Sequence, residues 1–489
     1  MYTNQKFANS LDWTMLEIKL PREIHKSPLA AEVALSSLLQ SGGVGNIYAR
    51  EFEGKLPNYF SLEIASLEGV VHFYIRTQKK FRSVIESNFY AQYPGIEIVE
   101  AEDYTKQIRY HHLSKDVSLW GLNYRPNGKW TPTDPETGKG FIKKKDKKIY
   151  EMKADFLPLK TYVDYGLDKD PKEEFKVDPL TPLLEMMGAI GKGEYLWYQV
   201  LVQDESVHDD KKFKKFYVNE ETHEHLSLKD MAVLYKKNVR TAGWTIKGKN
   251  KVDEFGVPTV VDSYDDKLQQ QFDVEVDKDG KETRKPKKVL ATYLETKSVP
   301  KKEMDLTADE KDELEAINKK FSKSLALAVI RLVYVTKKEN FDASYITNTL
   351  SFSKPFNGAN SLIPAKVTDP YDYPWQKLGN KRVCWRSEET FEAYVERAGF
   401  FPHIPERKEL DKWEDIFFWA ATMRTRKTFR MFYEAIFFPF SHPSPEDVVF
   451  TANLEELATL WHLPGAVATT PTLPRIDSTK GVAPVNLPL

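Results

Sequence analysis

The order of periodic segments in the first hundred residues constrains the fold of this chain more than any other feature. Residues 14–20 alternate apolar and charged side chains, as a half-buried strand does, and residues 28–39 carry apolar side chains at helical spacing. Residues 62–75 alternate again around a turn and predict a hairpin, residues 81–89 return to helical spacing, and a last strand begins at Ile96. The order β-α-β-β-α-β predicts a ferredoxin-like unit, in which two helices cover one face of an antiparallel sheet.

A looser version of this pattern recurs downstream. Asp178 precedes a short helical segment and the strand 195–203, and the capping box that begins at Thr307 precedes a helix and the β-rich run 325–335, which Arg331 interrupts. Between the two pairs, the chain is dense in Lys, Asp and Glu. We therefore expect an α+β protein with a second ferredoxin-like unit that carries a charged insertion.

The expected division of the chain has five parts. They are a first ferredoxin-like unit (1–123), a basic loop or linker (124–155), a second ferredoxin-like unit (156–365, insertion 204–305), a helical aromatic-rich region (366–465) and an extended Pro-rich tail (466–489).

Charge and cysteine content exclude several classes of protein. Lys and Arg number 71 and Asp and Glu number 72, so the net charge of −1 creates no overall field for a polyanion. Cys384 is the single cysteine, which excludes an internal disulfide framework and a Cys-rich metal site. The N-terminus lacks a signal-peptide pattern and no apolar run approaches the ~20 residues of a membrane helix. We expect a cytoplasmic protein, attached to the inner face of the membrane, if at all, through partners.

The sequence lacks the motifs of nucleotide hydrolysis and nucleophilic catalysis. The nearest approach to a phosphate-binding loop, 188–193, lacks the upstream glycine and the Ser or Thr, and it precedes its strand rather than following it. A tight turn from helix to strand explains it better. No Gly-x-Ser-x-Gly or His-Glu-x-x-His pattern occurs. We predict that the chain is not an enzyme, with no cofactor, no catalytic residue and no metal ligand.

Histidines and basic clusters leave two alternatives. A metal site of a hydrolase could be formed in the insertion by His208, His223 and His225, although such residues are more often solvated. Packing or hydrogen bonding better explains the other histidines considered, His111, His112 and His462. Two basic clusters could contact nucleic acid or lipid head groups, although a solvated loop tip and an amphipathic helix explain them as well. Their members are Lys143, Lys144, Lys145, Lys147 and Lys148 in the first, and Arg424, Arg426, Lys427 and Arg430 in the second.

Several stretches resemble one group of bacterial proteins. They are 16–24, 26–32, 60–66, 71–75, 90–94, 330–335, 453–465 (NLEELATLWHLPG), 471–476 and 486–488. These stretches are similar to the N-terminal, non-motor region of TraG/VirD-type and HerA-like DNA-translocating ATPases of type IV secretion and conjugation, as found in uncultivated bacteria. The most specific of them is 453–465, which lies shortly before the motor domain in the proteins that it resembles.

The resemblance implies a role without catalysis. It predicts a domain of unknown function that acts by protein–protein docking, as an accessory or N-terminal module of such an ATPase. The motor, which the chain lacks, is then expected on a partner chain or in a missing C-terminal part. DNA, a membrane-associated complex and a second copy of the chain are further partners that this assignment allows, and direct nucleic-acid binding through the basic clusters is the alternative function.

Overall fold

The computed structural model describes most of the chain, apart from two long stretches and several short ones. The described residues are 7, 10–21, 26–39, 55, 57–111, 116–130, 152–168, 177–204, 228–250, 260–262, 272–276, 282–286, 288–290, 292–366, 381–400, 448–465 and 474–476. Contacts within the chain divide it into two compact units, the first made of 1–129, 153–216 and 315–489 and the second of 130–152 and 217–314.

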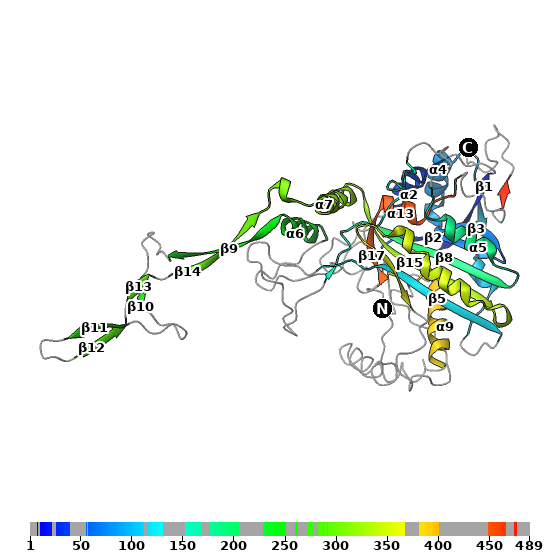
Figure 1. Ribbon diagram of the computed structural model, residues 1–489. Helices are drawn as coiled ribbons and strands as arrows, with labels where there is room; N and C mark the ends of the chain where they lie inside the picture. The colour runs from blue at the N-terminus through cyan, green and yellow to red at the C-terminus, as the bar shows by residue number, and fades with distance from the viewer. Residues whose placement is uncertain are drawn as a thin grey trace. The chain divides into compact units, whose positions relative to one another are not determined.

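The first half of the main sheet follows the order predicted from the sequence. Strand β1 leads to helix α2, the hairpin β2–β3 and helix α4 (Figure 1), and strand β4 follows. Ser27 takes the N-cap position of α2 with Pro28 as the first helical residue, as expected. The bounds are β1 Trp13–Pro21, α2 Pro28–Ser36, η1 Ser37–Leu39, β2 Tyr59–Leu67, β3 Val70–Gln78, η2 Lys79–Phe81, α4 Arg82–Gln92, β4 Glu97–Ala101 and η3 Tyr104–Gln107.

The second half is built from elements separated by longer stretches of chain. The predicted capping box is present, since Thr307 and Glu310 each accept a hydrogen bond from the other's backbone N–H. The bounds are β5 Val117–Pro126, α5 Thr181–Ala189, β8 Glu194–Asp204, α7 Ala308–Phe321, β15 Leu325–Lys337, η6 Lys338–Asn340, α8 Ala343–Ser351, η7 Lys354–Phe356 and β16 Leu362–Lys366.

The two halves form one continuous sheet. The strand order is β16-β5-β15-β8-β2-β3-β1, with β4 also paired to β1, and all of these pairs are antiparallel. Counted outward from the β2–β8 pair, the second half (β8-β15-β5-β16) repeats the order of the first (β2-β3-β1-β4). The α+β class is therefore confirmed, and the ferredoxin-like name for each half stays a prediction.

The predicted division into separate units differs from this arrangement. The expected boundaries at 123 and 365 fall inside β5 and β16, because strands from both halves complete the same sheet. Such pairing joins residues far apart in the sequence, and local periodicity carries no information about it. The expected charged insertion overlaps the second compact unit, which also includes 130–152.

The alternation of side chains gives the sheet two different faces. On β2, Leu62 and Ile64 belong to the large apolar core that includes residues of α2, α4 and α5. Between them Glu63 points to the opposite face, where helix α9 (Lys381–Val395) contributes Phe391 and Tyr394 to a second core.

Three short elements near the C-terminus join the first unit. Strand β17 (Phe450–Asn453) pairs with β15, helix α13 (Leu454–Leu460) follows at once, and β18 (Arg475–Ile476) pairs in parallel with the end of β1. The predicted short helix at 455–461 is thus confirmed within one residue.

The described part of the second unit consists of one complete helix, the first half of α7 and two-stranded ribbons. Lys301, which directly follows β14, forms an ion pair of 2.6 Å with Glu310, and the hydroxyl of Tyr235 donates to Glu313. The bounds are β6 Lys129–Trp130 and β7 Met152–Lys153, which pair with each other at the junction of the units, and α6 Leu228–Val239, β9 Thr241–Asn250, β10 Val260–Asp262, β11 Phe272–Val276, β12 Glu282–Pro286, β13 Lys288–Leu290, β14 Thr292–Pro300 and η5 Glu303–Asp305.

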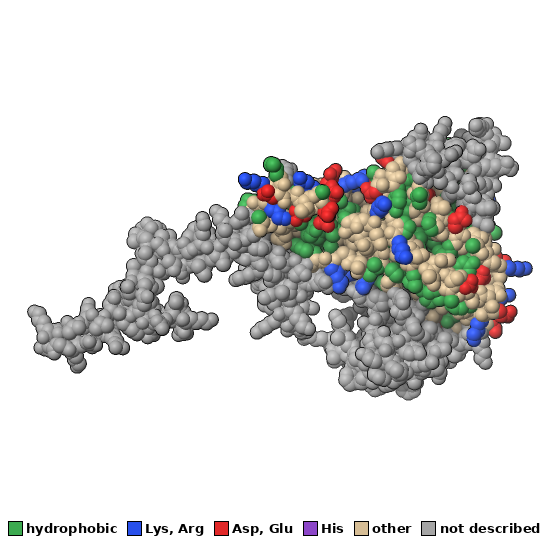
Figure 2. Space-filling model, viewed as in Figure 1, with side chains coloured by type: hydrophobic (Ala, Val, Ile, Leu, Met, Phe, Trp, Pro, Cys, Tyr) green, Lys and Arg blue, Asp and Glu red, His purple; other side chains and the backbone are tan. Residues whose placement is uncertain are grey.

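The described surface mixes charges of both signs. Figure 2 shows basic and acidic side chains interspersed with apolar ones on the face in view. None of the helices that the structure describes has the length and apolar character needed to cross a bilayer.

Candidate functional site

A row of polar side chains crosses the sheet on the face that α9 covers. Six neighbouring strands place one such residue each at matching register positions. In order across the sheet they are Glu17, Tyr74, Glu63, Gln199, Arg331 and Asn123. Because each lies opposite the next, the sheet pairing alone places side by side residues up to 208 positions apart, the separation of Asn123 and Arg331.

Hydrogen bonds link the central members of this row. The Gln199 amide donates to Glu63 Oε1 at 3.1 Å, and Arg331 donates to the side-chain oxygens of Gln199 and Asn123 at 3.3 and 3.1 Å. Glu63 and Gln199 have no exposed surface. Burial lowers the pKa of Arg331 to about 10, an effect that Tyr394 and Glu63 partly oppose.

The C-terminal end of α9 is held on this row. Arg331 donates to the carbonyls of Ala393 and Ala398, each at 2.7 Å, and Gln199 donates to the carbonyl of Tyr394 at 3.3 Å. The last carbonyls of a helix have no hydrogen-bond donor within the helix and carry partial negative charge. A guanidinium there supplies both the missing donors and a compensating positive charge.

Arg397 ends the helix in a left-handed conformation, with φ of 54°. The N–H of Ala398 bonds to the carbonyl of Ala393 and that of Arg397 to Tyr394, which is the pattern of a Schellman helix end. Glycine is the usual residue at this position because a side chain adds strain of about 1 kcal/mol or more. An arginine here must therefore be stabilised by its contacts.

The Arg397 side chain contacts two carboxylates, those of Glu63 and Asp103. Arg397 Nε lies 3.0 Å from Glu63 Oε1, and Arg397 Nη1 lies 2.6 Å from Asp103 Oδ2. The Tyr104 hydroxyl donates to Glu63 Oε2 at 2.6 Å and also bonds to the Tyr394 hydroxyl. Burial alone would raise the pKa of the Glu63 carboxyl, but Arg397 and these hydrogen bonds hold it below the usual value. The cluster is thus an internally satisfied clamp that fixes α9 to the sheet.

Two glycines allow α9 to approach the sheet closely. A Cβ on Gly121 of β5 would lie 2.9 Å from Thr390 Cγ2, and a Cβ on Gly399 would lie 2.6 Å from Leu201 Cδ1. Real Cβ atoms are not found this close to other side-chain atoms, so both positions depend on the missing side chain.

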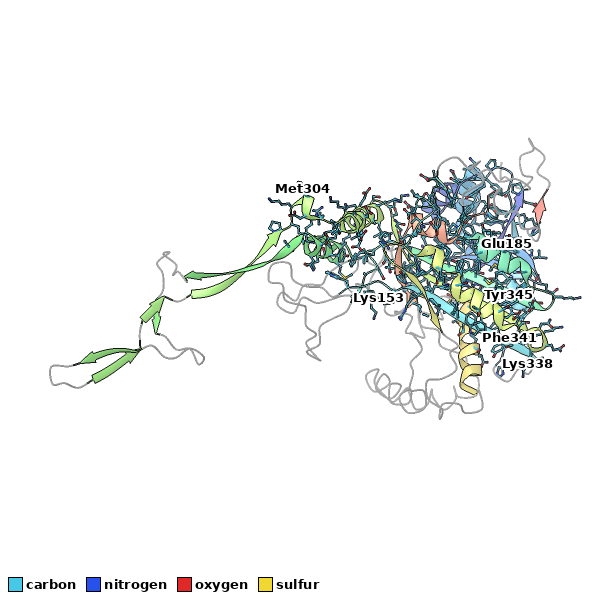
Figure 3. The ribbon with its side chains drawn as sticks, in the orientation of Figure 1. Lys153, Glu185, Met304, Lys338, Phe341 and Tyr345 are labelled. Carbon is cyan, nitrogen blue, oxygen red and sulfur yellow. The ribbon has the colours of Figure 1, made fainter. Side chains whose placement is uncertain are left out.

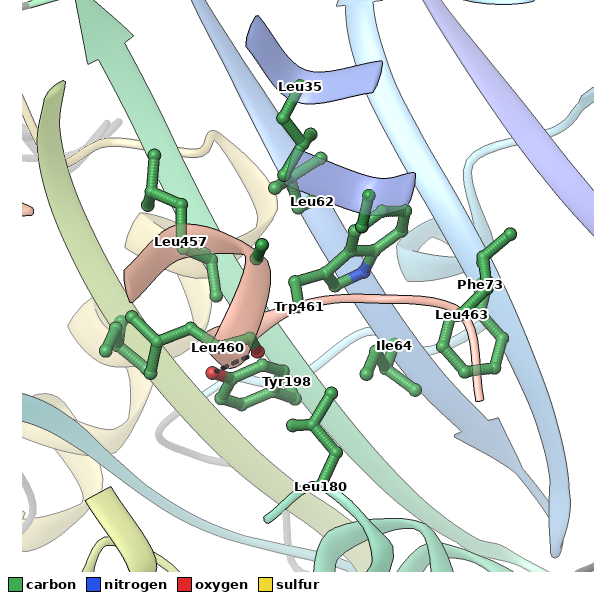
Figure 4. Packing of buried hydrophobic residues seen from close by; sticks show 14 of the residues in the cluster. Leu35, Leu62, Ile64, Phe73, Leu180, Tyr198, Leu457, Leu460, Trp461 and Leu463 are labelled. Carbon is green, nitrogen blue, oxygen red and sulfur yellow. Dashed lines mark hydrogen bonds between the residues drawn. The ribbon is translucent and has the colours of Figure 1, made fainter. Parts of the chain in front are cut away.

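The 453–465 segment occupies the opposite face, over the β2–β8 pair. Trp461 has no exposed surface and packs against Phe73 and Phe89, while the Tyr198 hydroxyl donates to the Leu460 carbonyl at 3.1 Å (Figure 4). Phe73 lies on β3 and Phe89 on α4, which both belong to the first half, whereas Tyr198 lies on β8 of the second half. The segment therefore connects both halves.

Charged groups at the start of α13 are paired inside the protein. Asn453 and Glu456 form a capping box, and the Lys320 ammonium lies 3.1 Å from Glu456 Oε2 with almost no exposed surface on either side chain. Glu455 forms ion pairs with Lys319 and Lys323 and accepts a short hydrogen bond from Thr161.

His462 forms a buried pair with Asp178. Its Nε2 lies 3.0 Å from Asp178 Oδ2 and its Nδ1 lies 2.8 Å from the Ala458 carbonyl. Both neighbours are acceptors, so both ring nitrogens must donate and the imidazole carries a proton on each. Burial opposes the charged form, but Asp178 and the carbonyl raise the pKa of His462 above 6.5. The prediction that His462 is hydrogen-bonded is confirmed.

The 188–193 stretch is the predicted turn from helix to strand. Glu194 accepts from Gly191 N at 2.6 Å and Glu68 accepts from Gly193 N at 3.0 Å, so carboxylates of the chain itself occupy these two N–H groups. At the same end of the sheet, Phe341 and Tyr345 lie close together (Figure 3), and their ring centres lie 6.0 and 5.3 Å from that of Tyr334.

The residues singled out from the sequence as contacts for nucleic acid or lipid lie outside the described residues. This holds for Lys143, Lys144, Lys145, Lys147, Lys148, Arg424, Arg426, Lys427 and Arg430, and also for His112, His208, His223 and His225. Cys384 lies on α9. Within the described ranges, no group of three or more His, Cys, Asp or Glu side chains is arranged to hold a metal.

The sequence offered a weak signal for the polar row. Arg331 interrupts the longest β-rich run and Glu63 lies between Leu62 and Ile64, so both are charges inside apolar strands. A charged side chain that is buried in an apolar strand needs a hydrogen-bond or ion-pair partner. The pattern does not show which residue that partner is.

Comparisons of the chain with models of known protein families, with curated proteins and with solved structures found no match.

Proposed function

We propose that this protein is a non-catalytic docking module of a DNA-translocating ATPase of the type IV secretion or conjugation class. The observation that supports this most is the position of the 453–465 segment, which carries the most specific resemblance to such proteins. Its Trp461 and Leu460 contact both halves of the sheet, and every residue of α13 is buried.

A buried connection of this kind suits a module that holds a bound partner in a fixed position. In the proteins that it resembles, this segment lies shortly before the motor. A rigid anchor there would hold a neighbouring motor at a fixed place relative to the sheet. The internally paired charges on both faces support a structural role for these residues rather than a reactive one.

The test first asks whether a DNA-translocating ATPase is encoded beside this chain in the source genome, and then combines the two purified proteins. We expect no ATP hydrolysis by the chain alone, a defined complex by size-exclusion chromatography with light scattering, and altered hydrolysis by the ATPase within the complex. ATP hydrolysis by the chain alone, or the absence of a complex, contradicts the proposal. Binding of DNA in the absence of the ATPase favours the alternative function.

A further inference from the structure

The ribbon formed by β9 and β14 separates charged from uncharged residues. Residues 243–250 and 292–299 pair one to one in an antiparallel register, and no third strand among the described ones joins them. Successive residues of a strand lie on opposite faces, so the register assigns every position to one of two faces. All charged residues of the paired segments fall on one face, and they are Lys247, Lys249, Glu295 and Lys297.

The other face of the ribbon, the uncharged face, consists of four residue pairs. They are Trp244–Ser298, Ile246–Thr296, Gly248–Leu294 and Asn250–Thr292. The first three pairs each join a large apolar residue to a smaller one. Large residues occur on both strands, so large and small positions lie side by side across the face.

An apolar face on a two-stranded ribbon needs a partner. Two strands alone are at best marginally stable in water, and they gain stability from further strands or a helix packed on their apolar face. Two other apolar side chains of the second unit are exposed as well, since Val233 on α6 is 50% exposed and Met304 in η5 is 92% exposed (Figure 3). Apolar surface of this unit is therefore accessible to a partner.

We propose that the uncharged face of the ribbon binds the same face of a second copy of this chain. No charge is buried when two such faces meet, because every charged residue of the paired segments lies on the opposite face. The neighbouring large and small positions are what two interdigitating faces require. Contact of identical patches about a two-fold axis is also the commonest arrangement in homo-oligomers. This inference is independent of the proposed function, since it concerns the second unit and needs no other protein.

The size of the face sets the strength of the contact. At ~3.4 Å per residue the paired segments are about 24 Å long, and the face is only two strands wide. Such a contact buries less than the ~1,200 Å² that begins the range of standard stable interfaces. We therefore expect a reversible dimer that forms as the protein concentration rises.

Sedimentation velocity of the full chain over a wide range of protein concentration tests this contact. We expect the average mass to rise from one copy toward two. Ile246→Lys places like charges against each other in the dimer and should raise its dissociation constant at least about tenfold. Thr245→Lys is the matched control, because it adds the same charge at the preceding position on the opposite face, and it should dimerise as the wild-type protein does. A wild-type protein that is monomeric at every concentration, or equal behaviour of the two variants, overturns the proposal.

A mixture of variants distinguishes loss of the contact from loss of the fold. Position 246 lies beside the middle of the face, so a two-fold axis brings the two copies of this position close together. Ile246→Lys and Ile246→Glu should each be monomeric alone and should associate when mixed, because opposite charges then face each other. Circular dichroism checks that each variant is folded. Folded variants that stay monomeric in the mixture contradict the face-to-face contact.

Discussion

Arg397 Nε lies 3.0 Å from Glu63 Oε1, and this contact joins the end of helix α9 to the centre of the sheet. The two residues are 334 positions apart in the sequence. Arg397 adopts a backbone conformation that favours glycine, so its side chain must compensate for the strain. The clamp on the polar row is therefore the place where the tertiary fold overrides local preference.

Replacing Arg397 should be among the most damaging changes in the chain. Arg397→Met leaves Glu63 and Asp103 without their shared cation, and breaking a buried ion pair from one side costs about 3–5 kcal/mol. The free energy of unfolding from urea titration, followed by circular dichroism, measures this loss. Arg82→Met, which breaks exposed pairs with Glu86 and Glu100, is the control and should cost no more than ~1 kcal/mol. Equal losses in the two variants contradict the clamp.

Gly399 should tolerate no side chain. Gly399→Ala places a Cβ 2.6 Å from Leu201 Cδ1, and Leu201 is fully buried and cannot yield freely. Overpacking of this kind costs about 1–3 kcal/mol. Gly191→Ala is the matched control, because its Cβ would meet only Glu194 at an ordinary 3.4 Å, and it should change stability by less than ~0.5 kcal/mol. Unfolding in urea compares the two, and an unchanged Gly399→Ala protein would show that α9 is loosely held.

Much of the fold follows from local pattern. The strands at 14–20 and 62–75 and the helices after Ser27 and Thr307 are visible because period and capping residues act over a few positions. The joining of both halves through β2 and β8 is not visible in this way. Glu63 meets Gln199 across 136 positions, and no local signal specifies which strand edges pair.

The candidate site was less accessible from the sequence than the fold. Runs of basic residues stand out in a sequence, whereas Glu63 and Arg331 are single charges within apolar strands. Glu63 and Arg331 each read locally as an interruption, and Arg397 reads as the polar end of a helix. Their common role depends on sheet register and on the docking of α9, which only the assembled chain defines.

Lys320 and Glu456 should behave as a coupled pair. Lys320→Met leaves the buried Glu456 carboxylate without its cation and should cost about 3–5 kcal/mol. Adding Glu456→Gln removes the uncompensated charge, so the double variant should recover part of the loss, with a coupling energy of roughly 0.5–3 kcal/mol in a double-mutant cycle. The partly exposed pair of Lys301 and Glu310 is the control, and Lys301→Met should cost much less than Lys320→Met because water screens the remaining charge. Additive effects of Lys320→Met and Glu456→Gln would contradict the coupling.

The pair of His462 and Asp178 should make stability fall as the pH rises above about 6.5. The pKa of His462 is raised above 6.5 in the folded chain, because Asp178 and the Ala458 carbonyl outweigh burial. A group with a raised folded pKa contributes its full stability below the unfolded value and loses it as the pH rises through the folded value. The loss should therefore begin near pH 6.5 and be complete above the folded pKa.

Urea unfolding of wild-type and His462→Gln protein over this pH range measures the effect. Wild-type protein should lose stability relative to His462→Gln as the pH rises, since the variant has no imidazolium to deprotonate. Asp178→Asn should lower the titration midpoint of His462 observed by NMR, because the carboxylate that favours the charged ring is gone. His111→Gln, which changes a half-exposed ring, should keep the wild-type pH dependence. A His462 midpoint at or below 6.5 in the wild-type protein would exclude a doubly protonated ring and with it the ion pair that joins α13 to the residues before α5.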